Sequence, residues 1–578
     1  MRPANPLMNS YNNTIIWFVR LGLVLLTTVA FFPALEAGFI TWDDPAMVLD
    51  NPYFHDLSPT SLLKLFSQPY MTVYQPLTVL SLAVQFRVAG MDPFFFHLGN
   101  LLLHIANVLL ALELSRRLGL RLTWACAAAA LFAVHPGRVE SVAWITERKD
   151  VLFAFFYLLG LHLQLAGPDT KAPRLRLSVT LCVLLSLLSK PTAISFPFVL
   201  AVLNHFKNTG TVLETMKQCR FLFIIIGIVG IIAVSGAAAE PQRNQYHDAA
   251  DSGVADRIGR VFIATGALFR CVAVPIDIPL FIPYVPPGQW PPQALSWGIA
   301  SALFCALLVA SRKAPLRYCG LLFFPVALLP VSAGIFFHGL GQFFTASWHA
   351  YLPAFGLFLC VADALQSASA FLRERKMLIW ETVLLAAALC AGSWMAHETA
   401  LRCAFYQDAI TFWNEVVRQT PHYIAFNNRG MAQFLAGDAE NARSDFRIVT
   451  RLQPRYARGW VHLAAAELSL GRPNDARAIL EKAVAEWPGE PMIHDYLGLI
   501  AAGASRTAEA VAHYSEALRL DPGYVASLNN RAALYLRTGE VGKAIADLDA
   551  ALRIKPGDMR LRNLRNSIVS GISRGGGD

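Results

Sequence analysis

Charged side chains are scarce in this chain. Only 15% of its 578 residues are Asp, Glu, Lys or Arg, whereas 55% are hydrophobic. A soluble core of this size would not bury so much apolar surface, so the composition excludes a soluble globular protein and indicates a membrane protein. The formal net charge of +9 does not indicate a nucleic-acid partner, because the basic residues form short clusters between apolar segments.

Metal-ligand spacing is also missing, and no signal-peptide cleavage site follows the first apolar segment. The nine cysteines, from Cys126 to Cys403, lie mostly within apolar stretches. This distribution predicts small core residues instead of a metal centre. Because no small-residue cleavage site follows residues 15–35, we expect them to form an uncleaved first span.

Apolar segments of about 17 to 25 residues, the length that crosses a bilayer, recur along the first two thirds of the chain. About eleven spans are expected, at 15–35, 95–114, 122–139, 150–167, 174–190, 192–206, 220–238, 294–311, 318–337, 349–367 and 377–396. Residues 257–275 would break the alternation of faces if they crossed. Because Arg257, Arg260 and Arg270 are spaced along this segment, we expect an interfacial or re-entrant helix there.

Basic clusters follow every second span, and the positive-inside rule assigns such loops to the cytoplasm. The clusters are Arg116/Arg117/Arg121, Lys171/Arg174/Arg176, Lys207/Lys217/Arg220, Arg312/Lys313/Arg317 and Arg373/Arg375/Lys376. With Arg2 also inside, the outer face is expected to carry residues 36–93, 136–149, 239–293 and everything after about 397.

The last third of the chain has a period. Its prolines, which lie 33, 34, 34 and 34 residues apart, are Pro421, Pro454, Pro488, Pro522 and Pro556. This is the period of tetratricopeptide repeats. A leading half-repeat, QDAITFWNEVVRQTP, precedes four full repeats. Small residues recur where paired helices approach (Gly430, Ala464, Gly498, Ala532, Ala442, Ala476, Ala510 and Ala544), and bulky ones fill the seams (Trp460, Phe446, Tyr514 and Tyr535).

These patterns divide the chain into two domains. Residues 1–397 are expected to form a polytopic membrane domain with outer loops at 36–93 and 239–293, and residues 404–570 the repeat domain. Residues 571–578 are expected to be a disordered tail.

Two adjacent carboxylates lie in the first outer loop, within FITWDDPAMVLDNP (residues 39–52). Asp44 precedes Pro45, a pattern typical of a helix N-cap with proline at the first helical position, and this motif alone favours capping over catalysis. Acidic, aromatic and basic residues kept at one outer face of a membrane protein instead favour a functional site.

The stretch from residue 39 to about 205 resembles the transmembrane and tetratricopeptide-repeat O-mannosyltransferases. The matching pieces are TWDDPAMVLDNP, VYQPLTVLSL, FFFHLGNLLLHIANVLL, LFAVHPGRVESVAWITERKDVL and LLSKPTAISFP, and WHAYLPAFG and the repeats extend the match. The resemblance implies a C-type glycosyltransferase fold and a catalytic carboxylate in the first outer loop. It also implies a polyprenyl-phosphate sugar donor, and repeats that present the protein acceptor on the same side.

By this resemblance, Asp43 or Asp44 is the base that deprotonates the attacking hydroxyl. A sugar on a lipid phosphate already has a good leaving group, so one carboxylate and cations that hold the phosphate suffice. Neighbouring residues in an extended chain point to opposite sides, so one of the two faces the acceptor. Asp44 is slightly favoured, because the family motif continues from it into the short helix.

A second outer motif, AVHPGRVESVAWITERKD, joins two spans and carries His135, Arg138, Glu140, Arg148 and Asp150. One interpretation is a solvated turn with an ion pair between Arg148 and Asp150. The other is that Arg148, which matches the family's basic position, binds the donor phosphate through a charge-assisted fork. Glu140 and His135 are further candidates for the donor site.

Three more polar residues are candidates near this motif. His97 and His104 share one helical face with Asn100 between them, which favours buried, hydrogen-bonded histidines over a donor-site role. Lys190, which precedes Pro191 at a membrane boundary, is either a snorkelling anchor or a phosphate contact.

Two cations expected from the resemblance are missing. Gln75 stands where relatives usually have Arg, and Trp348 stands in place of an acidic-Arg-Tyr run. Arg257, Arg260 and Arg270 in the outer loop are candidates to replace these charges.

Two asparagines mark the repeats. FNNRG (426–430) and LNNRA (528–532) place Asn428 and Asn530 at the same repeat position, where asparagine can hold the backbone of an extended acceptor peptide. His462 and Tyr496 interrupt this ladder, so local structural hydrogen bonding is favoured over acceptor binding.

The sequence therefore predicts an all-α protein with a membrane C-type glycosyltransferase domain of about eleven spans and a tetratricopeptide solenoid. We expect an inverting enzyme that moves a sugar, by resemblance mannose, from a polyprenyl-phosphate carrier to Ser or Thr of exported proteins recruited by the repeats. A rival interpretation is an inactive membrane scaffold, and a third is transfer to a glycan or lipid. Compact loops favour the bacterial inner membrane, with site and repeats facing the periplasm, over the endoplasmic reticulum with lumenal repeats.

Overall fold

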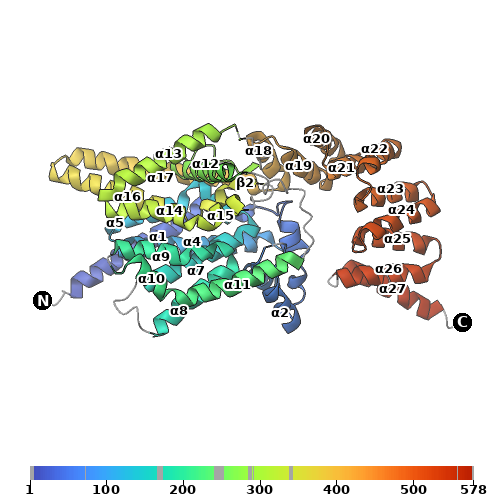
Figure 1. Ribbon diagram of the computed structural model, residues 1–578, viewed down its shortest axis with the longest axis horizontal. Helices are drawn as coiled ribbons and strands as arrows, with labels where there is room; N and C mark the ends of the chain where they lie inside the picture. The colour runs from blue at the N-terminus through green and yellow to red at the C-terminus, as the bar shows by residue number, and fades with distance from the viewer. Residues whose placement is uncertain are drawn as a thin grey trace. The chain divides into compact units, whose positions relative to one another are not determined.

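The computed structural model describes residues 6–71, 73–165, 173–207, 209–239, 253–283, 290, 292–337, 343–555 and 558–575. Helices account for most of these residues (Figure 1). The two strands within these ranges are β1 (Phe281–Pro283) and β2 (Phe343–Ala346), which pair antiparallel. The predicted all-α class is confirmed. Arg2, Lys171 and Pro556, which the sequence analysis used, lie outside the described residues.

Each expected span coincides with a helix or a pair of helices. They are α1 (Pro6–Phe31), α4 (Pro93–Arg117), α5 (Leu122–Val134), α7 (Arg148–Gln164), α8 (Pro173–Ser189), α9 (Phe196–Phe206), α11 (Arg220–Ala239), α13 (Ala294–Ala310), α14 (Pro315–Ala327) with α15 (Leu329–Phe337), α16 (Ala354–Glu374) and α17 (Leu378–Cys403). By length and apolar composition, 6 helices of the described chain qualify to cross a membrane, or 7 if α11 and the bent α10 (Val212–Gln218) form one span. The count of eleven stays a prediction, because α5 has only 13 residues.

Helices, most of them short, form the connections that are expected on the outer face. They are η1 (Phe32–Glu36), η2 (Pro45–Leu49), η3 (Pro52–Phe54), α2 (Pro59–Ser67), α3 (Pro76–Ala89), η4 (Pro136–Arg138), α6 (Val139–Ala143), η5 (Ile145–Glu147), η6 (Pro191–Ser195), α12 (Val254–Ala273), η9 (Ser347–Ala350) and η10 (Ala404–Tyr406), while η8 (Ser311–Lys313) follows α13. Proline opens many of them, because its fixed φ suits the first helical position. Helix α12 occupies the segment expected to be interfacial or re-entrant, and it is not among the helices that qualify as spans.

Glycines bring some membrane helices into backbone contact. A Cβ atom on Gly320 of α14 would lie 2.4 Å from the carbonyl oxygen of Gly356 on α16, and one on Gly356 would lie 2.4 Å from the carbonyl oxygen of Gly320. Such small-residue contacts are typical of helix pairs in membranes.

Polar side chains on α4 fix the segments that follow it. His104 Nδ1 lies 2.7 Å from Tyr351 Oη and its Nε2 lies 3.0 Å from the Ala133 carbonyl oxygen. Asn107 donates to the Val151 carbonyl at 2.9 Å. All three side chains, His104, Asn107 and Tyr351, are buried. The buried, hydrogen-bonded role predicted for His104 is therefore confirmed.

The C-terminal third folds into antiparallel helix pairs (Figure 1). After α18 (Ala409–Gln419) the pairs are α19 (Tyr423–Leu435) with α20 (Ala439–Leu452), α21 (Ala457–Ser469) with α22 (Pro473–Glu486), α23 (Pro491–Gly503) with α24 (Thr507–Leu520), and α25 (Val525–Arg537) with α26 (Val541–Ile554); α27 (Met559–Gly575) follows. The predicted half-repeat and four repeats are confirmed.

The small residues of the repeats make room for rings. A Cβ atom on Gly430 would lie 2.7 Å from the Phe446 ring, and one on Gly498 would lie 2.7 Å from the Tyr514 ring. Both rings are almost fully buried. The glycines are therefore required by helix packing within a repeat.

Two compact units make up the chain. Residues 1–49 and 57–412 form the membrane unit, and residues 50–56 and 413–578 form the repeat unit. The division between the units falls within α18. The boundary expected near residue 397 does not coincide with a break, since α17 continues through it to Cys403. The disordered tail expected at 571–578 is wrong for its first five residues, since α27 runs to Gly575. A single glycine such as Gly571 costs a helix only about 1 kcal/mol.

Candidate active site

The paired carboxylates differ in exposure. Asp44 is fully buried and Asp43 is partly exposed. Asp44 Oδ2 accepts the Ile40 backbone N–H at 2.7 Å, and its Oδ1 accepts the Trp144 indole N–H at 3.1 Å. The N-cap interpretation is therefore wrong for Asp44, because both oxygens bind groups outside η2. A turn bond from the Met47 N–H to the Asp43 carbonyl, 2.8 Å, begins η2 instead.

Burial controls the protonation of both carboxyl groups. It raises the pKa of Asp44 from 3.8 to about 7, although the hydrogen bonds from Ile40 and Trp144 favour the ionised form. Burial also raises the pKa of Asp43, and the positive charge of Lys149 opposes that shift. A carboxyl group that titrates near neutral pH is suited to accept a proton during catalysis.

The second outer motif is buried along its length from 132 to 148. It is held by Asn100 of α4, whose side-chain amide donates to the carbonyls of Val142 and Trp144 at 3.2 and 3.0 Å. The solvated-turn interpretation is therefore wrong. The motif is a rigid connection between α5 and α7, because its backbone is fixed by a neighbouring helix.

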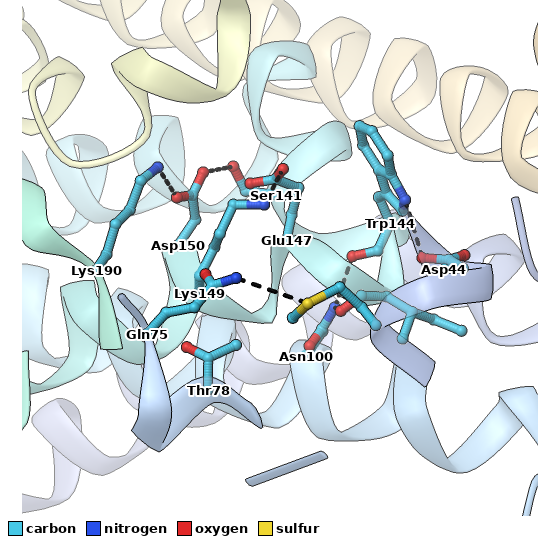
Figure 2. A network of polar contacts seen from close by, with 12 residues as sticks. Asp44, Gln75, Thr78, Asn100, Ser141, Trp144, Glu147, Lys149, Asp150 and Lys190 are labelled. Carbon is cyan, nitrogen blue, oxygen red and sulfur yellow. Dashed lines mark hydrogen bonds and ion pairs between the residues drawn. The ribbon is translucent and has the colours of Figure 1, made fainter. Parts of the chain in front are cut away.

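Arg148 is committed to neighbouring helices. Its Nη2 donates to Gln85 Oε1 at 2.7 Å and to the Phe96 carbonyl at 2.8 Å, and its Nε donates to Asn100 Oδ1. The expected ion pair between Arg148 and Asp150 is absent from the described structure. Asp150 instead pairs with Lys190 and accepts from Ser141 Oγ at 3.0 Å (Figure 2).

Glu140 lies in a buried polar cluster. One carboxylate oxygen accepts the Ser347 hydroxyl, and the other has no hydrogen-bond partner among the described residues. Burial raises the pKa of Glu140 to about 8, against the Ser347 hydrogen bond and the charge of Arg402. Glu140 is therefore mostly protonated near neutral pH and can donate a hydrogen bond.

Two other predicted residues, His135 and Arg138, have structural contacts. His135 Nδ1 accepts the Gly137 N–H at 3.1 Å, and its Nε2 lies 3.0 Å from the Val272 carbonyl oxygen. Arg138 donates to the Ala350 carbonyl at 3.3 Å and also to that of Tyr351. These contacts hold η4 against α12 and η9.

His97 is buried on α4, with its ring beside the backbone of Gly38 and Ala143. It lies next to the loop that carries the paired carboxylates. The burial predicted for His97 agrees with the structure, but neither ring nitrogen has a hydrogen-bond partner among the described residues.

The two missing cations are replaced by packing. Gln75 donates to the Met47 sulfur at 3.7 Å (Figure 2). The Trp348 ring lies edge-on to Trp144, with ring centroids 5.8 Å apart. Of the arginines proposed to substitute, Arg260 is paired with Asp256 at 2.7 Å on its own helix.

Residues missed by the sequence analysis complete the site. Trp144 binds Asp44, and Lys149 pairs with Glu147 at 2.6 Å (Figure 2). Arg402 of α17 supplies the buried charge near Glu140 and donates to the Ile278 carbonyl at 3.0 Å. Lys149 and Trp144 lie in the same motif as Arg148, so the sequence could have identified them as site residues. Nothing in the sequence pointed to Arg402, because it lies far from the motif, near the end of α17.

The asparagines of the repeats make local hydrogen bonds. Asn530 donates to Asp495 Oδ1 at 3.1 Å, and Asn428 accepts from Asn427 at 3.2 Å. The structural interpretation favoured from sequence is confirmed for these contacts. Acceptor binding by Asn428 and Asn530 stays a prediction.

No group of three His, Cys, Asp or Glu side chains within the described residues could hold a metal ion. Lys149 pairs with Glu147, Lys190 pairs with Asp150, and the charge of Arg402 acts on Glu140.

Comparison with known proteins supports the family resemblance. The chain is 29% identical over 160 residues to human protein O-mannosyl-transferase TMTC3, covering 25% of this chain and 17% of the relative. It is 33% identical over 147 residues to Drosophila melanogaster Tmtc1 (24% and 17%) and 28% identical over 248 residues to Drosophila Tmtc2 (40% and 26%), both protein O-mannosyl-transferases. The matches therefore span about a quarter or less of these relatives' own length. The resemblance inferred from the motifs is confirmed, and the chain is an integral membrane protein.

The repeats have matches of their own. The tetratricopeptide repeat family model matches residues 436–491 and 497–558. A tetratricopeptide-repeat protein of Thermus thermophilus is 24% identical, covering 28% of this chain and 89% of that structure with a TM-score of 0.27.

Proposed function

We propose that this chain transfers a sugar from a polyprenyl-phosphate carrier to Ser or Thr hydroxyls of exported proteins. The names of its relatives support protein O-mannosylation as the reaction class. The observation that carries the proposal is the partly exposed carboxylate of Asp43, which adjoins the buried Asp44 in the chain and on which the positive charge of Lys149 acts. A carboxylate base and a cation are the two groups that the reaction requires.

In the proposed reaction the acceptor hydroxyl oxygen attacks the anomeric carbon of the donor. The bond from that carbon to the phosphate oxygen breaks, and the phosphate leaves with the bonding electrons. The hydroxyl proton passes to the carboxylate base. A single displacement of this kind inverts the configuration at the anomeric carbon.

The two carboxylates divide the work in this proposal. The sequence slightly favoured Asp44 as the base, but both of its oxygens are occupied by Ile40 and Trp144 in a buried position. Asp43 is the carboxylate that an acceptor can reach. We therefore assign the base to Asp43, and to Asp44 the role of fixing the loop that carries it.

The repeats would supply the acceptor. Stacked repeats form an extended concave surface that suits a peptide, and the alternation of basic loops predicts the carboxylates and repeats on the same outer face. Capture by the repeats would raise the acceptor concentration near Asp43. In this proposal the outer face is the periplasmic side of a bacterial inner membrane.

Mass spectrometry of exported proteins tests the function. Cells that carry the gene should show hexose additions on Ser or Thr that are lost on deletion, restored by the wild-type chain and not restored by Asp43→Asn. Unchanged spectra in all strains would reject the transferase.

Trp348 and Gln75 favour one alternative, an inactive scaffold. Both stand where the family resemblance led us to expect Arg, and both make packing contacts. A scaffold would require the repeats in cells but not Asp43. Restoration of a deletion phenotype by Asp43→Asn would therefore support the scaffold.

A further inference from the structure

Lys149 and Lys190 are each paired with an acid of the second outer motif. Lys149 Nζ lies 2.6 Å from Glu147 Oε1, and Lys190 pairs with Asp150. The relative solvent-accessible surface is 17% for the Lys149 side chain and 12% for that of Lys190. It is only 2% for Glu147 and 1% for Asp150. The lysine side chains are therefore more exposed than the acids with which they pair, and Figure 2 shows both pairs.

Lys149 has unused binding capacity. A lysine ammonium has three N–H donors, and within the described residues its hydrogen bond goes to Glu147. The second oxygen of Glu147, Oε2, is buried and has no partner among those residues. Glu147 therefore competes for this ammonium, but burial raises its pKa to about 7, so it can take up a proton when a phosphate replaces it and is not left as an unpaired buried charge.

Lys149 also lies within the electrostatic reach of the proposed base. Its charge acts on Asp43, and it also acts on Asp150 and on His349. Lys190 acts on Glu147 and His349. The charges of both lysines thus act on Glu147 and His349, and that of Lys149 also acts on Asp43.

Arg148, the cation that the resemblance suggested for the donor phosphate, already uses its donors within the protein. Its guanidinium donates to Gln85, Phe96 and Asn100. Replacing those three bonds by a phosphate would leave buried acceptors without donors, which costs about 1–3 kcal/mol for each.

We propose that Lys149, with Lys190, binds the phosphate of the donor, and that Glu147 and Asp150 hold the two lysines until a phosphate replaces them. The ligand chemistry is a phosphate ester, and the pair supplies the charge absent at Gln75 and Trp348. The identification of this phosphate as the sugar carrier rests on the proposed function, whereas the phosphate site itself does not.

Binding of citronellyl phosphate to the purified full chain in detergent tests the proposal by titration calorimetry. Lys149→Met should weaken binding at least about tenfold, because it removes a charge-assisted hydrogen bond. Lys149→Arg should stay within about threefold of wild type, since it keeps the charge. Lys64→Met, at an exposed lysine of α2, is the matched control and should leave binding unchanged.

The variant Glu147→Gln distinguishes best between a phosphate site and a purely structural ion pair. It removes the competing acid and its repulsion of the phosphate, so binding should become about threefold or more tighter. A purely structural ion pair predicts no tightening. The double variant Lys149→Met/Glu147→Gln leaves no unpaired charge, so weak binding by this folded protein would separate loss of the site from loss of the fold.

Two further ligands separate the sources of phosphate. Competition by inorganic phosphate would show that the lysines read phosphate alone, and its absence would show that they require the lipid ester; either result fits if Lys149→Met weakens binding. Equal binding of the alcohol citronellol, or wild-type affinity in Lys149→Met, would overturn the proposal. If the cell experiment shows no hexose transfer that depends on the gene, while binding of citronellyl phosphate still depends on Lys149, the proposed function is rejected and the phosphate site is not.

Discussion

At the residue scale, the site depends on the different surroundings of two adjacent aspartates. Asp43 is partly exposed beside Lys149, while Asp44 is enclosed by Ile40 and Trp144. The proposed function therefore gives the same side chain two roles. In it, the carboxylate of Asp43 reacts and that of Asp44 holds the loop.

Asp43→Asn should lower transfer by at least about a hundredfold, the usual contribution of a general base. The amide has the same size, so membrane insertion and expression should be unchanged. Transfer to a peptide from a lipid-linked donor in proteoliposomes measures the effect. Asp92→Asn is the control, because Asp92 caps α4 through the Phe94 N–H and asparagine can also accept that bond. Full activity in Asp43→Asn would assign the base elsewhere.

Transfer should rise with pH through about 7. An acid is ionised above its pKa, so the Asp44 value of about 7 and the raised pKa of Asp43 both leave the carboxyl groups protonated at acidic pH. The ionised form of Asp44 is the one that accepts from both Ile40 and Trp144. Initial rates between pH 5.5 and 8.5 check this expectation. A rate that is flat from about pH 5 upward would indicate a base with an ordinary pKa.

At the element scale, helix pairs of the repeats approach through glycine. Gly498 on α23 faces the Tyr514 ring on α24, and Gly430 faces the Phe446 ring in the same way. Gly503 lies on α23 too, but no heavy atom lies within 4 Å of where its Cβ would be. The same residue type is therefore a packing requirement at one site and not at the other.

Gly498→Ala should destabilise the repeats by about 1–3 kcal/mol, because the added Cβ displaces a buried ring. Gly503→Ala should be neutral or stabilise by up to about 1 kcal/mol, because alanine is the better helix former. Pulse proteolysis in urea on the full chain compares the two variants. Equal stability of both would mean that the Tyr514 ring moves without cost.

At the scale of the whole molecule, the proposed function requires the carboxylates and the repeats on one side of the membrane. Each unit has its own core, and the buried clusters around Leu480 and Leu548 lie entirely within the repeats. The repeat unit is therefore expected to fold by itself. The membrane unit alone carries the proposed chemistry.

Cysteines introduced at Thr60 and Ser505 should react with an impermeant maleimide from outside, and one at Glu374 should not, because the basic loops predict opposite faces. Exposed Cys305 and Cys390 are first replaced by Ser to remove background. Labelling at Glu374 in intact cells or vesicles of known orientation would reverse the topology.

A purified fragment 404–578, added in excess, should inhibit modification of a full-length acceptor at least about tenfold, since it competes for that acceptor. It should not inhibit transfer to a short peptide at high concentration, which reaches the membrane unit without capture. A heat-unfolded fragment is the control. Undiminished modification of the full-length acceptor would show that the repeats serve another partner.

The sequence alone determined the architecture, because the lengths of apolar segments and the 34-residue period can be read directly along the chain without knowledge of tertiary contacts. It located the spans as helices, the four repeats and the loop that carries Asp43 and Asp44. It also singled out the motif from His135 to Asp150, although it read that motif as solvated.

Tertiary structure decided the partners within that motif. Arg148 turned to α3 and α4, Lys190 took Asp150, and Trp144 took Asp44. These choices depend on which helices pack together and how deeply each group is buried, since desolvation sets both the pKa of a carboxyl group and the need of each donor for an acceptor. Residues far apart in sequence, such as Glu140 and Ser347, meet only after that packing. A local pattern therefore identifies the groups of the site, and the packed interior assigns their roles.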